Sequence, residues 1–168
     1  MTGDGEHRPR RYAPWRWMYR TGRPNGLARF LNHLTARQFS AGVLTGGRGV
    51  TLEVLGRASG TSIAFPMAVA DVGGQRYLVS MLGDNTNWVR NVRAAGGRAV
   101  ISHRGRTAVV LEEVPVEHRA PILRRYLAVA PGARPHFPVS RRAPVEEFER
   151  IAARYPVFRI TPDPAGGP

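Results

Sequence analysis

The sequence predicts an α+β protein whose core is a six-stranded split antiparallel β-barrel with flanking helices. Two observations carry this prediction. Six short segments have the composition of strands, and short turns such as Gly73-Gly74 and Arg104-Gly105 join neighbouring segments as hairpins. Strands joined mostly by hairpins cannot form a doubly wound parallel sheet, because each parallel pair needs a crossover connection. An antiparallel barrel with helices at its rim is the remaining architecture.

The first half of the chain contains one expected helix and three expected strands. Apolar residues recur at helical spacing over 27–34, which indicates a short helix. The strand over 51–55 alternates and ends at a glycine. The strand over 62–71 contains Pro66, which predicts a sheet edge or a bulge at that point. After a Gly-Gly turn, residues 75–81 form the third strand.

The second half begins with a helix over 87–95, for which Thr86 is the expected N-cap and two glycines close the end. Pro115 suits the first turn of a later helix. The remaining elements follow from the same patterns: strands over 98–103 and 106–114, helices over 115–129 and 144–154 separated by a Pro-rich loop over 131–142, and a closing strand over 157–161.

The length of 168 residues fits one domain with two extensions. We divide the chain into a basic aromatic arm over 1–24, a cofactor-binding barrel domain over 25–161 and a tail over 162–168. The sequence contains no internal repeat that would indicate a second, similar unit.

The composition excludes several classes of site. The chain has no cysteine, which excludes disulfides, thiolate metal sites and cysteine nucleophiles. No segment approaches the roughly 20 apolar residues of a membrane span. We therefore expect a cytoplasmic protein, with membrane contact limited to the arm.

The formal net charge is +13, and all 25 basic residues are arginine. Arginine in place of lysine is typical of the codon bias of a GC-rich genome. A strongly positive protein attracts polyanions and charged cofactors. The chain carries no zinc-finger pattern and no aromatic RNA-binding signature, so we expect no specific nucleic-acid partner.

The arm is dense in aromatic residues, with Trp15, Trp17 and Tyr19 close together between arginines. Its composition is typical of a flexible extension. A second interpretation is that these side chains find an apolar partner, because aromatic rings are costly to leave in water. The arm would then fold over an apolar substrate or contact a membrane surface.

A Gly-rich segment, Gly56-Arg57-Ala58-Ser59-Gly60-Thr61, joins the first two expected strands. One interpretation is an ordinary hairpin loop with an incidental arginine. The other is a seat for an anion, in which glycines let backbone N–H groups approach oxygen atoms and Arg57 supplies a planar charged fork.

A second polar segment, residues 80–92, begins at the end of the third strand and continues into the expected helix over 87–95. A helix N-terminus favours anions and polarised carbonyl groups. Trp88 and Asn91 are three residues apart and share a helix face, so an indole and an amide project together. The alternative is that Trp88 packs in the core and Asn91 satisfies backbone groups.

Together these two segments resemble the deazaflavin-dependent nitroreductases, a family found chiefly in actinobacteria. The resemblance rests on Gly56–Gly60 followed, after a strand with an internal proline and a Gly-Gly turn, by the spacing of Asn85, Trp88 and Asn91. It covers residues 25–161 and is strongest over 50–115. The resemblance implies a split β-barrel that binds coenzyme F420, an 8-hydroxy-5-deazaflavin with an acidic tail; FMN is the less favoured cofactor.

The resemblance also implies roles for individual residues. Arg57 and Ser59 would hold the acidic tail, the segment 80–82 would line the ring, and Trp88 and Asn91 would surround the phosphate and ribityl region. Relatives often carry lysine where this chain has Ala58, a departure that Arg48, Arg90 or Arg93 could offset. The expected cofactor-binding positions are Gly56, Arg57, Ser59, Gly60, Pro66, Ser80, Met81, Leu82, Trp88 and Asn91.

The chain is poor in acid–base machinery. It has no Ser-His-Asp order, no HExxH motif and no metal spacing among its five histidines. This composition suits chemistry that a cofactor supplies. The expected catalytic candidates are His136, Tyr126 and Tyr155, of which His136 is the best proton donor because imidazole titrates near neutrality. Residues of these types in such positions are more often packing residues than catalytic ones.

The sequence therefore predicts an enzyme, a reductase that transfers a hydride from reduced F420 to a quinone, nitroaromatic or activated enone acceptor, acting as a monomer or homodimer. Two alternatives stay open. One is a split-barrel module that binds FMN, haem or lipid without the deazaflavin reaction. The other is a cofactor-free descendant that uses its cavity for an isomerisation or cyclisation.

Overall fold

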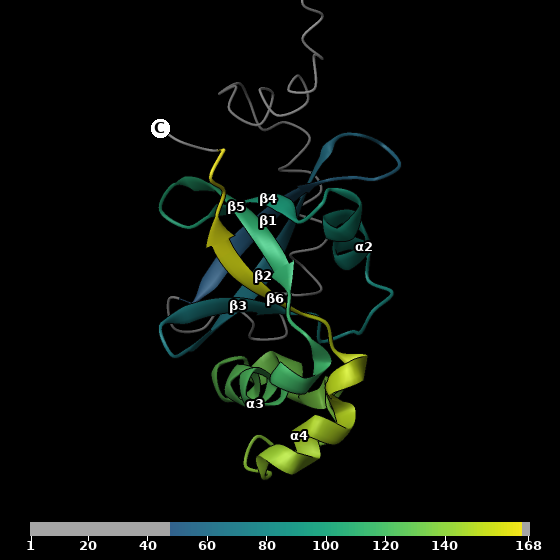
Figure 1. Cartoon of the computed structure of the whole chain (residues 1–168), viewed down its shortest axis with the longest axis vertical. Helices are drawn as coiled ribbons and strands as arrows, with labels where there is room; N and C mark the ends of the chain where they lie inside the picture. Colours follow the sequence, from purple (N-terminus) through teal and green to yellow (C-terminus); the bar gives the residue numbers. More distant parts are fainter. Residues whose placement is uncertain (1–47, 166–168) are drawn as a thin grey trace, which may run out of the picture.

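A computed structural model describes residues 48–165. Six strands form a closed antiparallel barrel in the order β1-β2-β3-β6-β5-β4 (Figure 1). This confirms the expected fold class. The arm over 1–24 and the helix expected over 27–34 lie outside the described residues. Among the described helices, none is long and apolar enough to cross a membrane.

The strands match the six expected from the sequence, and half of their ends are shifted by one or two residues. Every neighbouring pair is antiparallel. The strands are β1 (Gly49–Leu55), β2 (Ser62–Val72), β3 (Gln75–Val79), β4 (Arg98–Ser102), β5 (Arg106–Glu113) and β6 (Val157–Pro162).

Strand β2 changes its partner strand along its length. It pairs with β1 from Ser62 to Ala68, and its pairing with β3 begins at Val69. Pro66 lies opposite Thr51 of β1 and has no β3 partner. Because proline lacks an N–H donor, it is tolerated where one side of a strand is free. The predicted edge at Pro66 is therefore confirmed, and it leaves an open side on the barrel.

The helices form two groups (Figure 1). Helix α2 lies against the barrel, whereas α3 and α4 pack together at one end of it. We call residues 116–155 the helical unit. The α-helices are α2 (Asn87–Ala94), α3 (Ala120–Val129) and α4 (Val145–Ile151), and the 3₁₀ helices are η3 (Val116–His118), η4 (Pro131–His136) and η5 (Ala152–Arg154).

The single helix expected over 115–129 is wrong. A 3₁₀ turn, η3, precedes α3, and Pro121 lies in the first turn of α3. Proline has no N–H to donate to the carbonyl four residues earlier, so an α-helix cannot run through it without a lost bond. Likewise the loop expected over 131–142 contains η4, and the helix expected over 144–154 divides into α4 and η5.

The buried arginine Arg119 joins the helical unit to the barrel. It is 6% exposed, and its Nε donates to the Val114 carbonyl over 2.8 Å. Its other nitrogens donate to the carbonyls of Ala152 and Tyr155 and to the Glu113 carboxylate. These hydrogen bonds to carbonyl and carboxylate oxygens offset the free-energy cost of burying the guanidinium charge. Arg119 therefore stabilises the contact between the helical unit and the barrel.

Candidate cofactor-binding site

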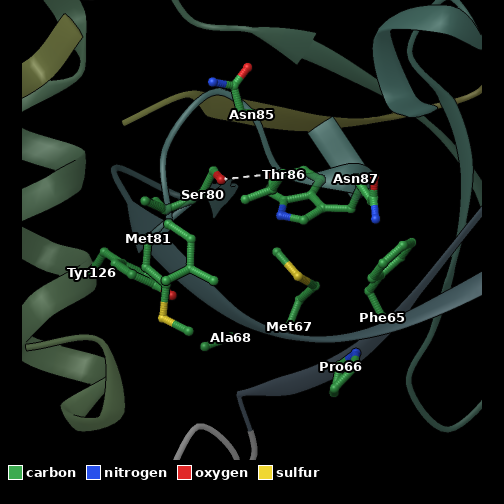
Figure 2. Close-up of a pocket in the computed structure, with 13 residues that line it drawn as sticks. Phe65, Pro66, Met67, Ala68, Ser80, Met81, Asn85, Thr86, Asn87 and Tyr126 are labelled. Atoms are coloured by element: carbon green, nitrogen blue, oxygen red, sulfur yellow. Dashed lines mark hydrogen bonds between the residues drawn. The ribbon is translucent and has the colours of Figure 1, made fainter. Parts of the chain in front are cut away.

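A cavity of about 360 Å³ lies along the open side of β2 (Figure 2). Its volume falls within the range of about 300–1,000 Å³ that is typical of small-molecule sites. Residues from β2, the segment after β3, the start of α2 and helix α3 surround it. The lining residues are Phe65, Pro66, Met67, Ala68, Val79, Ser80, Met81, Leu82, Asn85, Thr86, Asn87, Trp88 and Tyr126.

The walls of the cavity are mainly apolar. Trp88 is 7% exposed and is held from behind by Phe158, with ring centroids 5.4 Å apart in an edge-on arrangement. Met67 and Met81 contribute flexible, polarisable side chains (Figure 2), which adapt to the shape of a ring. Leu82 is 58% exposed. An exposed leucine on the lining offers apolar surface that a ligand would cover.

The hydroxyl of Ser80 organises the loop rather than facing a ligand. Ser80 is fully buried, and its Oγ donates to the Gly83 carbonyl over 2.6 Å. Its Oγ also lies 3.1 Å from the Thr86 Oγ1, which leaves Thr86 as the donor of that bond (Figure 2). A hydroxyl has one proton, so the donor capacity of Ser80 is used within the protein.

The N-terminus of α2 opens onto the cavity without a side-chain cap. Thr86 occupies the N-cap position, but its hydroxyl makes no capping bond because it is bonded to Ser80. Thr86 is therefore the N-cap expected from the sequence, but it makes no side-chain capping bond. The first turn also carries no acidic residue. The free N–H groups of a first helical turn carry partial positive charge, which attracts a carbonyl oxygen or an anion.

Tyr126 is the one titratable side chain among the lining residues. It is 3% exposed, and its hydroxyl makes no hydrogen bond to any of the residues 48–165. Figure 2 shows it projecting from α3 toward the cavity. Burial raises the pKa of Tyr126 well above its ordinary value of 10.0. The phenol is therefore protonated at neutral pH and presents a hydrogen-bond donor to the cavity.

The structure brings six of the expected site residues together around this cavity: Pro66, Ser80, Met81, Leu82, Trp88 and Tyr126. The sequence analysis missed Phe65, Met67 and Ala68, which flank Pro66. The internal proline was the available signal, because an unpaired stretch of strand can expose both neighbours of a proline to one cavity. The Asn85–Asn87 stretch was in the expected motif without a role assigned to it.

The Gly56–Gly60 loop does not line the cavity, but it is attached to the same helix. The backbone N–H and the Nη1 of Arg57 both donate to the Asn91 Oδ1, over 3.2 and 2.9 Å. Asn91 is 2% exposed, so these two bonds satisfy the hydrogen-bonding capacity of its buried oxygen. Because Trp88 and Asn91 lie one turn apart on α2, the helix connects the cavity wall to Arg57.

The loop itself is closed by main-chain bonds. The Gly56 N–H donates to Thr61 and the Gly60 N–H donates to Gly56, each over 2.8 Å. Gly60 has φ +64°, a left-handed conformation that favours glycine. Ser59 Oγ lies 2.9 Å from the Thr61 hydroxyl. Arg57 is exposed at the tip, where a charged ligand could reach it.

His136 and Tyr155 are not part of the cavity lining. The Tyr155 hydroxyl donates to the His136 carbonyl over 2.8 Å, and its ring stacks on Phe137 with centroids 4.0 Å apart. These contacts give Tyr155 a packing role, whereas His136 contributes its main-chain carbonyl and is exposed. Their catalytic roles stay predictions that this location does not favour. Over residues 48–165, no group of acidic or histidine side chains could hold a metal ion.

Comparisons with known proteins show the fold alone. No family model matches the chain, and no curated protein matches it. A protein of unknown function from Agrobacterium tumefaciens is similar to 80% of this chain, with a TM-score of 0.52 and 14% identity. The match covers 55% of that protein, so the present chain spans about half its length.

Two further solved structures are similar to part of the chain. A conserved hypothetical protein from Mycobacterium tuberculosis matches 74% of this chain and 78% of its own length, with a TM-score of 0.51 and 16% identity. An F420-H2 dependent reductase matches 68% of this chain and 94% of its own length, at 22% identity and a TM-score of 0.43. That last similarity is too weak to support a shared function.

Proposed function

We propose that this protein is a reductase that binds coenzyme F420 in the cavity and reduces a quinone, nitroaromatic or activated enone. One observation carries the proposal. The cavity is apolar and neutral on its walls, with one protonated phenol and an uncapped helix N-terminus as its polar features. Such a lining binds and orients a reactive group but supplies no acid–base chemistry of its own.

The residues present fit the ring of the coenzyme. Trp88, Phe65 and the two methionines offer flat or adaptable apolar surface to a planar ring. The backbone N–H groups at the start of α2 offer donors to ring carbonyl oxygens. The Asn87 amide lies at the same rim.

The acidic tail has fewer obvious partners. Arg57 is exposed and is held on α2 by Asn91, and Arg90 is exposed on the same helix. Ala58 stands where relatives often carry lysine, so one cation of the usual set is missing. The tail would then depend on Arg57, and a charge-assisted hydrogen bond of this kind contributes about 1.5–3 kcal/mol.

When bound in its reduced form, the coenzyme supplies a hydride to an electrophilic acceptor. The chain's residues exclude water with the apolar walls and hold a proton at the Tyr126 Oη. This hydroxyl has no partner among residues 48–165, so it is free to donate a hydrogen bond to an acceptor oxygen that gains negative charge. A donor aimed at developing charge in a dry site stabilises it more than water does.

The proposal is tested by titrating oxidised F420 with the protein and following the coenzyme's fluorescence, with FMN titrated in parallel. We expect saturable binding of F420 and binding of FMN at least about tenfold weaker, because FMN lacks the longer acidic tail that Arg57 would meet. Saturable binding of FMN with none of F420 would overturn the assignment and indicate a flavin protein.

A matched pair of variants locates the binding. Leu82→Ser removes apolar surface at the cavity, and Val116→Ser makes the same kind of change at the other large exposed apolar side chain of residues 48–165. Burial of a leucine is worth about 1.5–3 kcal/mol, so we expect Leu82→Ser to weaken F420 binding at least about tenfold. Val116→Ser should leave it unchanged. Equal effects of the two variants would place the coenzyme elsewhere.

A further inference from the structure

A second cavity, of about 280 Å³, lies beside the β2–β3 hairpin. It lies among the first residues of β1, the last part of β2, the start of β3 and the turn after β4. Strand β1 runs from this cavity at Arg48 and Val50 to the Gly56–Gly60 loop after Leu55. The two cavities share no lining residue. The second is lined by Arg48, Val50, Val69, Asp71, Arg76 and His103.

The floor and the rim of this second cavity differ in character. Val50 and Val69 are 5% and 6% exposed and belong to the barrel core, so the floor is apolar. The rim carries three basic side chains and one carboxylate. A cavity with an apolar floor and a charged rim suits a ligand that has one charged end and one aliphatic end.

The single carboxylate on the rim is already occupied by arginines. Arg48 pairs with Asp71, and Arg125 of α3 contacts the same Oδ1 over 3.3 Å. Two cations around one carboxylate leave an excess of positive charge. Asp71 therefore does not neutralise the remaining basic residues of the rim.

Arg76 and His103 complete the rim. Arg76 is exposed, and although it lies opposite Asp71 in the β2–β3 ladder, it makes no ion pair with any residue from 48 to 165. His103 Nδ1 lies 3.1 Å from the Gly49 carbonyl, which can only accept, so Nδ1 carries a proton.

The turn that carries His103 is strained. Arg104 has φ 57°, the one non-glycine residue among 48–165 with a positive φ. Left-handed backbone at a residue other than glycine costs about 1 kcal/mol and often accompanies a functional site. Here it places His103 over the start of β1, at the rim of the cavity.

We propose that this second cavity binds a small amphiphilic anion, a carboxylate or phosphate group on a short aliphatic chain. The anionic group would lie beside Arg76 and Arg48, and the aliphatic chain would cover Val50 and Val69. The site is separate from the coenzyme cavity, and the proposal stands whether or not F420 binds there.

Binding is measured by amide NMR titration of the full chain with n-butyl phosphate, pentanoate, inorganic phosphate and 1-butanol. We expect saturable shifts of the Val50, Val69 and His103 amides with one or both of the aliphatic anions, and the tighter of the two identifies the headgroup. Each buried methylene is worth about fourfold in affinity, so inorganic phosphate should bind at least about tenfold more weakly than n-butyl phosphate. 1-Butanol should produce no saturable shift.

Two variants with the same change in charge separate a site from general attraction. We expect Arg76→Gln to weaken binding of the preferred anion at least about fivefold, and Arg150→Gln, at an exposed position of α4, to change it less than about twofold. Equal weakening by both variants would overturn the proposal and indicate diffuse surface charge. Saturable shifts confined to residues 80–88 would also overturn it, because the anion would then occupy the coenzyme cavity.

Discussion

The coenzyme cavity and the helical unit both use aromatic side chains, but they differ in how their polar atoms are satisfied. In the helical unit, Phe137 lies between Tyr155, at 4.0 Å between centroids, and Tyr126, at 6.3 Å. The Tyr155 hydroxyl is bonded to the His136 carbonyl. In the cavity, Trp88 packs on Phe158 and leaves its remaining surface on the lining.

Tyr126 belongs to both regions, and its hydroxyl shows the difference between them. Its ring packs with the aromatic residues of the helical unit, while its hydroxyl has no partner among residues 48–165. The hydroxyl of Tyr155 is used within the helical unit. The hydroxyl of Tyr126 lies at the cavity lining, where a ligand can reach it. Whether the hydroxyl has a hydrogen-bond partner within the protein therefore distinguishes a tyrosine that only packs from one that can bind a ligand.

The largest expected effect comes from removing the centre of the aromatic stack. Phe137 is 7% exposed and contacts both tyrosines, so Phe137→Ala should lower the free energy of unfolding by about 3–5 kcal/mol. Urea unfolding measures this directly. Leu82→Ser at the cavity should change it by less than about 0.5 kcal/mol, because Leu82 is 58% exposed. A comparable loss in both variants would contradict the division between a packing region and a ligand-binding region.

The fold could be predicted because its signals are local. Strand patterns, Gly-Gly turns and the proline at Pro66 each depend on a few neighbouring residues. The error at Pro121 has a different cause, because the missing N–H of a proline is itself a local signal that was not used. Thr86 is the N-cap as expected, and its lack of a side-chain capping bond follows from a competing bond to Ser80, six residues away.

The candidate site was predicted in part for the same reason. The motif around Trp88 contains residues that remain neighbours after folding. His136 and Tyr155 were chosen for their chemistry, but the location of each hydroxyl and imidazole depends on packing among η4, α4 and the barrel. The pairing of Arg57 with Asn91 spans 34 positions, and no local pattern contains it.

A smaller effect tests whether the cavity region extends to the Arg57 loop. Arg57→Ala and Asn91→Leu should each weaken F420 binding by about 1.5–3 kcal/mol, because each removes the same contact between loop and helix. The double variant should bind about as weakly as the worse single variant. Arg142→Ala, which removes the same charge at an exposed loop position, is the control. Additive losses would show that Asn91 contacts the coenzyme independently of Arg57.

Tyr155→Phe and Tyr126→Phe form a matched pair of variants, because each removes only a hydroxyl group. Tyr155→Phe removes the bond to the His136 carbonyl, so it should lower the free energy of unfolding by about 0.5–1.5 kcal/mol and leave turnover unchanged. Tyr126→Phe removes no bond among residues 48–165, so its stability should be unchanged or slightly raised. Its kcat with a quinone acceptor should fall at least about fivefold. The reverse pattern, with turnover lost in Tyr155→Phe, would restore Tyr155 as a catalytic residue.

The smallest expected effect is a pH dependence of the loop at the cavity. The hydrogen bond from Arg93 to Asp84, 2.7 Å long, lowers the pKa of Asp84 below its ordinary value of 3.8. A carboxylate with a lowered pKa stabilises the fold above its unfolded pKa, and this contribution is lost as the pH falls through the lower folded value. Because the Asp84 side chain is 58% exposed, the contribution should stay below about 0.5 kcal/mol. Urea unfolding of the wild type and Asp84→Asn should therefore show a small difference at pH 6 that disappears by about pH 2. A difference that persists at pH 2 would mean that Asp84 acts through the shape of the loop, and the cavity region would then resemble the helical unit in its dependence on packing.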